Sequence, residues 1–208
     1  GQAESLGCCG GFGGVIDGAG TLWSVSPNQR SLLRLDTSAM TGACINFTPS
    51  AFTPKGVAVD AAGDIWVAGG AEVRRLDSAG NETGQFPIAG ASNLHGLVVH
   101  PLDQSIFVAS FGNGTVYRLD NSGSLLATIA VGTQPNGVAV DGQGKVWVSN
   151  QGSDDAMRID VASNAVDLTV SLGSGSQPFN PSDMTGDVTY VATVAVGDWT
   201  VVSDGGEA

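Results

Sequence analysis

The side chains best suited to acid–base chemistry in this sequence are its two histidines, His95 and His100. A neutral imidazole accepts a proton near pH 7, so a histidine in a cleft is a common general base. The acids that could act with them include four glutamates, Glu4, Glu72, Glu82 and Glu207. His95 and His100 are therefore candidate catalytic residues, and the alternative for each is a structural role.

A second candidate site is the acidic pair Asp154 and Asp155, which lies in a Gly-Ser-Asp-Asp turn. Carboxylate oxygens are the ligands that Ca²⁺ and Mg²⁺ prefer, so this turn could hold either ion. The alternative is an exposed loop that binds no metal, and no other cofactor is expected. Nucleophilic catalysis lacks support, because no Gly-x-Ser-x-Gly motif occurs and the cysteines are far from both histidines in sequence.

The three cysteines, Cys8, Cys9 and Cys44, all lie in the first quarter of the chain. Two adjacent thiols without a nearby histidine supply too few ligands for a zinc site. A disulfide from Cys44 to Cys8 or Cys9 would tie the N-terminal arm to the first repeat, and a disulfide favours an extracellular setting. Three buried free thiols are the alternative.

The charge balance limits the partners, since 20 acidic residues stand against 8 Lys and Arg for a net charge of -12. Such a chain repels phosphate backbones and anionic lipid, so nucleic acid and membrane surfaces are poor partners. No run of about 18 apolar residues occurs, so no membrane insertion is expected. The scarcity of lysine and abundance of glycine suggest a secreted or cell-surface protein of bacterial type.

The elements that position these residues come from an internal repeat. Four segments begin with a glycine and a short apolar run, and their first glycines are 43, 40 and 41 residues apart. These glycines are Gly13, Gly56, Gly96 and Gly137. The run ends in Asp, or in His100 in the third copy, and an aromatic residue follows six or seven positions later. The aromatic residues are Trp23, Trp66, Phe107 and Trp147.

Each copy then closes on a second motif, Arg-Leu-Asp or Arg-Ile-Asp. It occurs at 34–36, 75–77, 118–120 and 158–160, and the aromatic residue precedes its Asp by 13, 11, 13 and 13 positions. Two motifs at matched spacing in four copies indicate one structural unit repeated four times. No window of 11 residues carries a helical period, so the chain is predicted to be all-β.

Each copy is predicted to form four antiparallel strands joined by tight turns. Units of about 41 residues with four strands are typical of the blades of a β-propeller. The repeated Trp and Phe are interpreted as packing between blades. The repeated Arg and Asp are interpreted as tying a blade to its neighbour or capping a turn. His100 stands where the other copies carry Asp, so replacement of a turn-capping acid is its structural interpretation, whereas His95 could line the axial mouth.

The pattern resembles the streptogramin-lyase-like and NHL-type propeller repeats, over residues 13 to about 178. The resemblance implies the propeller fold more strongly than any one function, because such repeats occur in lyases, scaffolds and surface proteins. For a lyase, the resemblance implies a His and Glu pair that acts with a divalent cation to open a cyclic ester by elimination. No glutamate stands in a matching repeat position here, so the resemblance transfers no catalytic residue to this chain.

The domain organisation follows from the repeats. Residues 1–12 form an N-terminal arm, and the blades occupy about 13–55, 56–95, 96–136 and 137–179. Residues 180–208 are predicted to be a partial fifth blade or the start of a further β-rich module.

The predicted function is a non-catalytic extracellular module for structure, adhesion or assembly, with protein partners or self-assembly. One alternative is glycan or peptide binding on the propeller face, and the other is a cation-dependent lyase of the streptogramin-lyase-like class.

Overall fold

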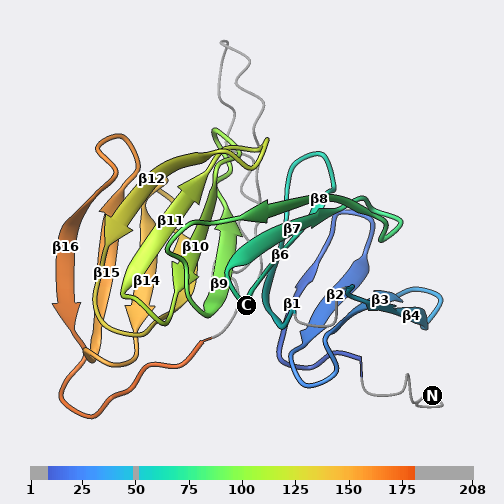
Figure 1. The fold of residues 1–208 in the computed structure, drawn as a ribbon, viewed down its shortest axis with the longest axis horizontal. Coiled ribbons are helices and arrows are strands. Elements are labelled where there is room, and N and C mark those ends of the chain that lie inside the picture. Colours follow the sequence, from blue (N-terminus) through green and yellow to red (C-terminus); the bar gives the residue numbers. More distant parts are fainter. Residues whose placement is uncertain (1–8, 49–51, 181–208) are drawn as a thin grey trace, which may run out of the picture.

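A computed structural model describes residues 9–48 and 52–180 of the chain, and this part is all-β. Four separate sheets follow one another, each with four strands in chain order and each neighbouring pair antiparallel (Figure 1). The β-propeller architecture with four blades, predicted from the repeats, is therefore confirmed. No helix long and apolar enough to cross a membrane occurs among the described residues.

Every blade runs from an inner first strand to an outer fourth strand. Blade 1 contains β1 Gly13–Ile16, β2 Thr21–Ser26, β3 Ser31–Asp36 and β4 Thr41–Asn46. Blade 2 contains β5 Pro54–Val59, β6 Ile65–Gly69, β7 Glu72–Leu76 and β8 Glu82–Pro87. Blade 3 contains β9 Leu94–Val99, β10 Ile106–Ser110, β11 Thr115–Leu119 and β12 Leu125–Ala130. Blade 4 contains β13 Pro135–Val140, β14 Val146–Asn150, β15 Asp155–Asp160 and β16 Ala165–Ser171.

In blades 2 to 4 the inner strand begins two residues before the glycine that opens the sequence repeat. The predicted fifth blade or further module at 180–208 lies outside the described residues, apart from Asn180.

Apolar cores fill the spaces between consecutive blades. The core between blades 1 and 2 joins Trp23 and Val25 of β2 to Val57 and Val67 of blade 2. Equivalent cores join blade 2 to blade 3 and blade 3 to blade 4. Because successive residues of a strand point to opposite faces, blades 2 and 3 contribute alternate residues to the cores on their two sides. The blades therefore stabilise one another, and each sheet is covered by its neighbours in chain order.

The aspartate that ends the inner strand joins that strand to the next one. In blade 2 one carboxylate oxygen of Asp60 accepts a hydrogen bond from the Asp64 amide, at 2.9 Å. The other oxygen accepts the indole N–H of Trp66, at 2.9 Å. The same pair of bonds is made by Asp17 with Trp23 in blade 1 and by Asp141 with Trp147 in blade 4. One carboxylate thus caps the hairpin turn and also holds the orientation of the buried indole.

Blade 3 replaces both partners of this bond at once, with His100 for Asp and Phe107 for Trp. The residue inserted into its turn brings Asp103 into the place of the missing carboxylate. The Asp103 Oδ1 atom accepts the Ser105 amide at 3.0 Å and lies 2.9 Å from Nδ1 of His100. Burial alone would raise the pKa of Asp103, but hydrogen bonds from Ser105 and His100 lower it to about 2. The structural interpretation of His100 as a substitute for the turn-capping acid is consistent with this geometry.

The repeated arginine of the third strand reaches the next blade. Its guanidinium lies over the aromatic residue of its own blade, at 5.5 Å from the Trp66 ring in the case of Arg75. It also donates to a backbone carbonyl in the turn between the third and fourth strands of the following blade. These bonds are Arg34 to Ser78 at 3.2 Å, Arg75 to Asn121 at 3.1 Å and Arg118 to Val161 at 2.8 Å. We call each of them an arginine latch.

Residues 9–12 of the N-terminal arm lie on the outward face of blade 1, and a disulfide fixes them there. Cys9 is bonded to Cys44 of the outer strand β4, which selects one of the two pairings that the sequence left open. Two residues after Cys9, the Gly11 amide donates a hydrogen bond to the Ser24 hydroxyl of β2, at 2.8 Å. A Cβ atom on Gly10 would lie 3.2 Å from the side chains of Leu33 and Ser24, so the arm lies directly on the sheet.

The bond between aspartate and indole can be tested with the same substitution in two blades. Trp66→Phe leaves an oxygen of the buried Asp60 with one partner fewer and should cost about 1 to 3 kcal/mol in the free energy of unfolding. Trp147→Phe should cost less than about 1 kcal/mol, because Asp141 is half-exposed and water can replace the indole. Urea denaturation of both variants measures the difference, and equal losses would contradict this account.

The disulfide makes a separate prediction. Cys44→Ser opens a loop of 35 residues and should lower the free energy of unfolding by roughly 3 to 4 kcal/mol. Cys8→Ser is the matched control and should keep the stability of the unmodified chain. Thermal unfolding with and without a reducing agent distinguishes them, since reduction should destabilise only proteins that retain the Cys9–Cys44 bond.

Candidate functional site

The inner strands of blades 2 to 4 share a β-bulge at their first residues. The pairing with the second strand shifts register between Pro54 and Gly56, between Leu94 and Leu97, and between Pro135 and Val138. A bulge leaves a residue unpaired and re-aims its side chain, which is why bulges are frequent beside binding sites. Here the residue before the repeated glycine lies in the bulge of each strand, and these residues are Lys55, His95 and Asn136.

The three side chains make a continuous row across three blades, which we call the axial row. The Lys55 Nζ atom lies 2.8 Å from Nε2 of His95, and His95 Nδ1 lies 3.2 Å from Oδ1 of Asn136. Close approach of the strands requires a glycine, because a Cβ on Gly56 would lie 2.3 Å from the His95 carbonyl oxygen. The row therefore depends on the same glycine that marks the repeat.

His95 is the central member and is held on every side. Its side chain is buried, and its ring stacks on that of Phe111 with centroids 4.4 Å apart. Burial and the nearby charge of Lys55 lower the pKa of His95 to about 4, opposed by the hydrogen bond with Asn136. The imidazole is therefore neutral at pH 7, with Nδ1–H donating to Asn136 and Nε2 accepting from Lys55.

Lys55 is positioned by neutral acceptors. It donates to Nε2 of His95 and to Oδ1 of Asn93, the latter at 2.6 Å. Burial lowers the pKa of Lys55 below its ordinary value. Among the described residues no carboxylate forms an ion pair with Lys55. Asn93 itself has a left-handed backbone with φ of 54°, a conformation that is uncommon for residues with a side chain.

His100, the other candidate base, lies in a different place and does not join the axial row. Its ring nitrogens face the Asp103 carboxylate and the backbone oxygen of Gly144, at 2.9 and 3.1 Å. Both nitrogens are therefore used in holding the turns of blades 3 and 4. The structure does not bring His95 and His100 together, and each makes its own contacts between blades.

The two acids of blade 4 have separate roles: Asp154 binds the chain that follows the blade, and Asp155 is bonded within the blade. The carboxylate of Asp154 accepts the Gly175 amide at 2.7 Å and the Gln177 amide at 2.8 Å. Asp155 accepts a bond from the Asn150 side chain, at 2.6 Å. No cluster of three His, Cys, Asp or Glu side chains that could hold a metal ion occurs in residues 9–48 and 52–180.

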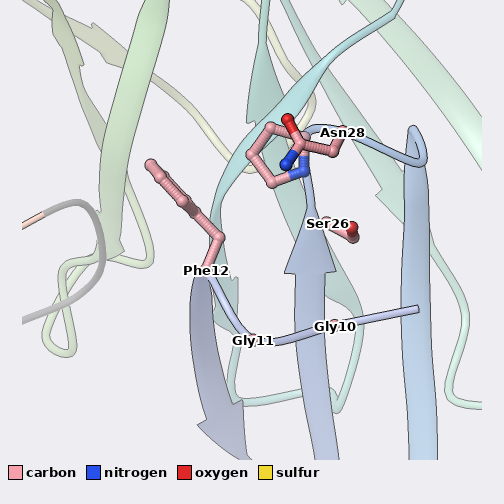
Figure 2. A pocket seen from close by; sticks show the side chains of 6 residues that line it. Gly10, Gly11, Phe12, Ser26 and Asn28 are labelled. Carbon is pink, nitrogen blue, oxygen red and sulfur yellow. The ribbon is translucent and has the colours of Figure 1, made fainter. Parts of the chain in front are cut away.

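A hollow of about 260 Å³ lies beside the N-terminal end of blade 1 (Figure 2). It is bounded by the arm on one side and by the turn after β2 on the other, with Gly11, Phe12 and Asn28 among its lining. Phe12 is the blade 1 counterpart of the axial row, because it precedes the first repeated glycine. The lining carries no charged group, so the hollow offers packing and amide contacts rather than catalysis.

The outward face of blade 4 forms a second kind of candidate site, which we call the distal face. It carries Trp147, Arg158, Leu168 and Val170, because cross-strand pairing places these residues side by side. Their counterparts in blade 2 include Trp66, which is fully buried against blade 3. In blade 4 the Trp147 ring is only half-buried, while 38% of Leu168 and 39% of Val170 are exposed. Arg158 pairs with Asp167 of its own blade, at 2.8 Å, instead of latching onto another.

Sequence reasoning identified His95 but missed its partners Lys55 and Asn136. The signal was their common position, one residue before the glycine of each repeat. Three different polar residues at one repeat position gave no recognisable motif, so only the bulged geometry shows that they meet.

Comparison with solved structures shows which folds this arrangement resembles. A streptogramin B lyase matches with a TM-score of 0.72 at 16% identity, over 79% of this chain and 56% of that one. The virginiamycin B lyase of Staphylococcus aureus matches with a TM-score of 0.73 at 14% identity, over 83% and 59%. The hydrazine synthase of Kuenenia stuttgartiensis matches with a TM-score of 0.68 at 17% identity, over 80% and 51%.

These likenesses establish a β-propeller similar to that of the streptogramin B lyases. The chain spans 51% to 59% of the length of these three structures. No protein-family model matches the sequence, and no curated protein matches it either.

The buried neutral His95 predicts a pH dependence of stability. Its pKa is about 4 in the folded protein, below the ordinary value of 6.5, so the unfolded chain binds more protons between these values. Stability should therefore rise from pH 4 to pH 6.5, by on the order of 2 to 3 kcal/mol. His95→Gln should flatten the curve in this window, because the imidazole is absent in both states. Urea unfolding across the range measures the slope, and a slope unchanged in the variant would contradict it.

Proposed function

We propose that this protein is a non-catalytic, extracellular propeller module whose role is structural, and that it assembles through the distal face of blade 4. The observation that supports the proposal most directly is the fourth arginine latch. Three of the repeated arginines donate to the following blade. Arg158 occupies the equivalent position of the equivalent strand but pairs within its own blade.

The distal face has the chemistry of the three interblade faces. Trp147, Leu168 and Val170 present apolar surface, and the Arg158 guanidinium lies 5.8 Å from the Trp147 ring centroid, as in the other blades. Its best-fitting occupant is a blade of the same kind, which offers an apolar sheet face and a turn carbonyl for the arginine. We propose that a second copy of the chain supplies this blade, rather than the fifth blade predicted at 180–208.

A structural role agrees with the way the reactive groups are used. His100 and Asp154 hold turns, and His95 is stacked and hydrogen-bonded through both ring nitrogens. The Cys9–Cys44 disulfide favours an oxidising compartment, which supports an extracellular or cell-surface location. The net charge of -12 favours protein partners over nucleic acid or membrane surfaces.

Light scattering coupled to size exclusion tests the assembly. We expect a defined mass that is a multiple of the 20.9 kDa chain. Leu168→Lys places a charge on the distal face without touching a core and should weaken the association about tenfold or more. Leu102→Lys is the matched control, since Leu102 is 73% exposed in a turn of blade 3, and it should leave the mass unchanged.

Two outcomes would overturn the proposal. One is an unmodified chain that remains a monomer throughout the accessible concentration range. The other is an assembly that Leu168→Lys does not weaken relative to Leu102→Lys. Circular dichroism of each variant confirms that the propeller has folded before its mass is interpreted.

A further inference from the structure

Among the residues that the structure describes, no carboxylate pairs with the lysine of the axial row, whereas the other lysine of the sequence has two carboxylates beside it. Lys145 forms an ion pair with Asp160, and its ammonium lies 3.6 Å from Asp167. Its hydrogen bond with Asp160 raises the pKa of Lys145 above its ordinary value. Lys55 has two neutral acceptors in place of carboxylates, and burial lowers its pKa.

Within residues 9–48 and 52–180, one N–H of Lys55 has no acceptor and is left for another molecule. An ammonium group has three N–H bonds, of which Asn93 and His95 accept two. The His95 ring is fixed by Phe111 and Asn136, so it holds the ammonium in place rather than following it. A half-buried cation that is already oriented loses little freedom on meeting an anion.

The strands are also shaped to gather this row. The bulges in β5, β9 and β13 re-aim the row's side chains at the start of the inner strands. Asn93 and Gln134, which precede the bulges of blades 3 and 4, both have left-handed φ values of 54°. Similar values occur at Arg30 and Asn164 in turns of blades 1 and 4, so Asn93 and Gln134 mark the tight turns that lead into the bulged strands.

We propose that the axial row binds a ligand that carries a carboxylate group, with Lys55 as its cationic anchor. One carboxylate oxygen accepts the remaining N–H of Lys55 and supplies the missing negative charge. His95 and Asn93 are positioning residues that hold the ammonium, and Phe111 provides an apolar wall next to them. This site is independent of the distal face of blade 4 and adds ligand binding to the structural role.

Competitive acylation of the two lysines tests the site in the unmodified chain, with acetate as the probe. Acetic anhydride is a neutral reagent, and mass spectrometry of the peptides reports the labelling of Lys55 and Lys145 separately. Replacing chloride by acetate at equal ionic strength should slow labelling of Lys55 about threefold when acetate is at about twice its dissociation constant. Labelling of Lys145 should stay constant, because its carboxylate partners are already present.

The outcomes decide the proposal. The proposal would be overturned if Lys55 were acylated at the same rate in acetate as in chloride. It would also be overturned if acetate slowed the acylation of both lysines equally. Protection by inorganic phosphate as strong as that by acetate would overturn the assignment to a carboxylate.

A second measurement uses variants. Acetate should raise the melting temperature of the unmodified chain and of Lys145→Met, but not that of Lys55→Met. If Lys55→Met keeps the full acetate-induced rise, Lys55 is not the anchor. Because Lys145 is the only other lysine, Lys145→Met controls for the loss of one positive charge.

Discussion

The arrangement of the blades depends on the carboxylate that ends the inner strand in blades 1, 2 and 4. This carboxylate caps the first hairpin turn through one oxygen and orients a tryptophan through the other, as Asp60 does for Trp66. The oriented indole supports the arginine of the third strand, and that arginine reaches the next blade. Contacts between residues four and six positions apart thus support a contact between residues more than 40 positions apart. Without the carboxylate, the arginine would lose the surface that aims it.

Blade 3 shows that this chain of contacts can be rebuilt from other residues. Phe107 has no N–H to donate, so a carboxylate opposite it would lack its main partner. His100 and Asp103 replace that carboxylate, and Asp103 also pairs with the arginine Arg118. Arg118 still lies over the aromatic ring and still reaches blade 4. In blade 3 the aromatic ring, the hairpin turn and the acidic residue all differ from those of the other blades, whereas the bond from Arg118 to the next blade is kept.

The sequence was sufficient to predict the fold because the repeat is carried by short-range constraints. Glycine, Asp and Trp recur at fixed spacing since each spacing is set within one hairpin. The packing of Trp23, Trp66 and Phe107 and the roles of the arginines followed from the same motifs. The disulfide could be reduced to two pairings, because Cys8 and Cys9 are adjacent and sequence cannot say which one faces Cys44.

The axial row could not be predicted in the same way. A bulge depends on the register between two strands, and the residue types at positions 55, 95 and 136 do not reveal that register. Lys55, His95 and Asn136 share a position but no chemistry, so only their contacts show them to be one cluster. The distal face was equally hidden, because Trp147 and Arg158 match their counterparts in sequence and differ only in what covers them.

The acceptor in each arginine latch is a backbone carbonyl, and this affects how the repeats can evolve. The residues that offer it are Ser78, Asn121 and Val161, which share no side-chain chemistry. Since every residue has a carbonyl, a mutation in the turn of one blade need not be matched by a mutation in the blade before it. Blades joined in this way can be duplicated, exchanged or allowed to diverge one at a time. Their sequences can drift apart while the joints between them persist.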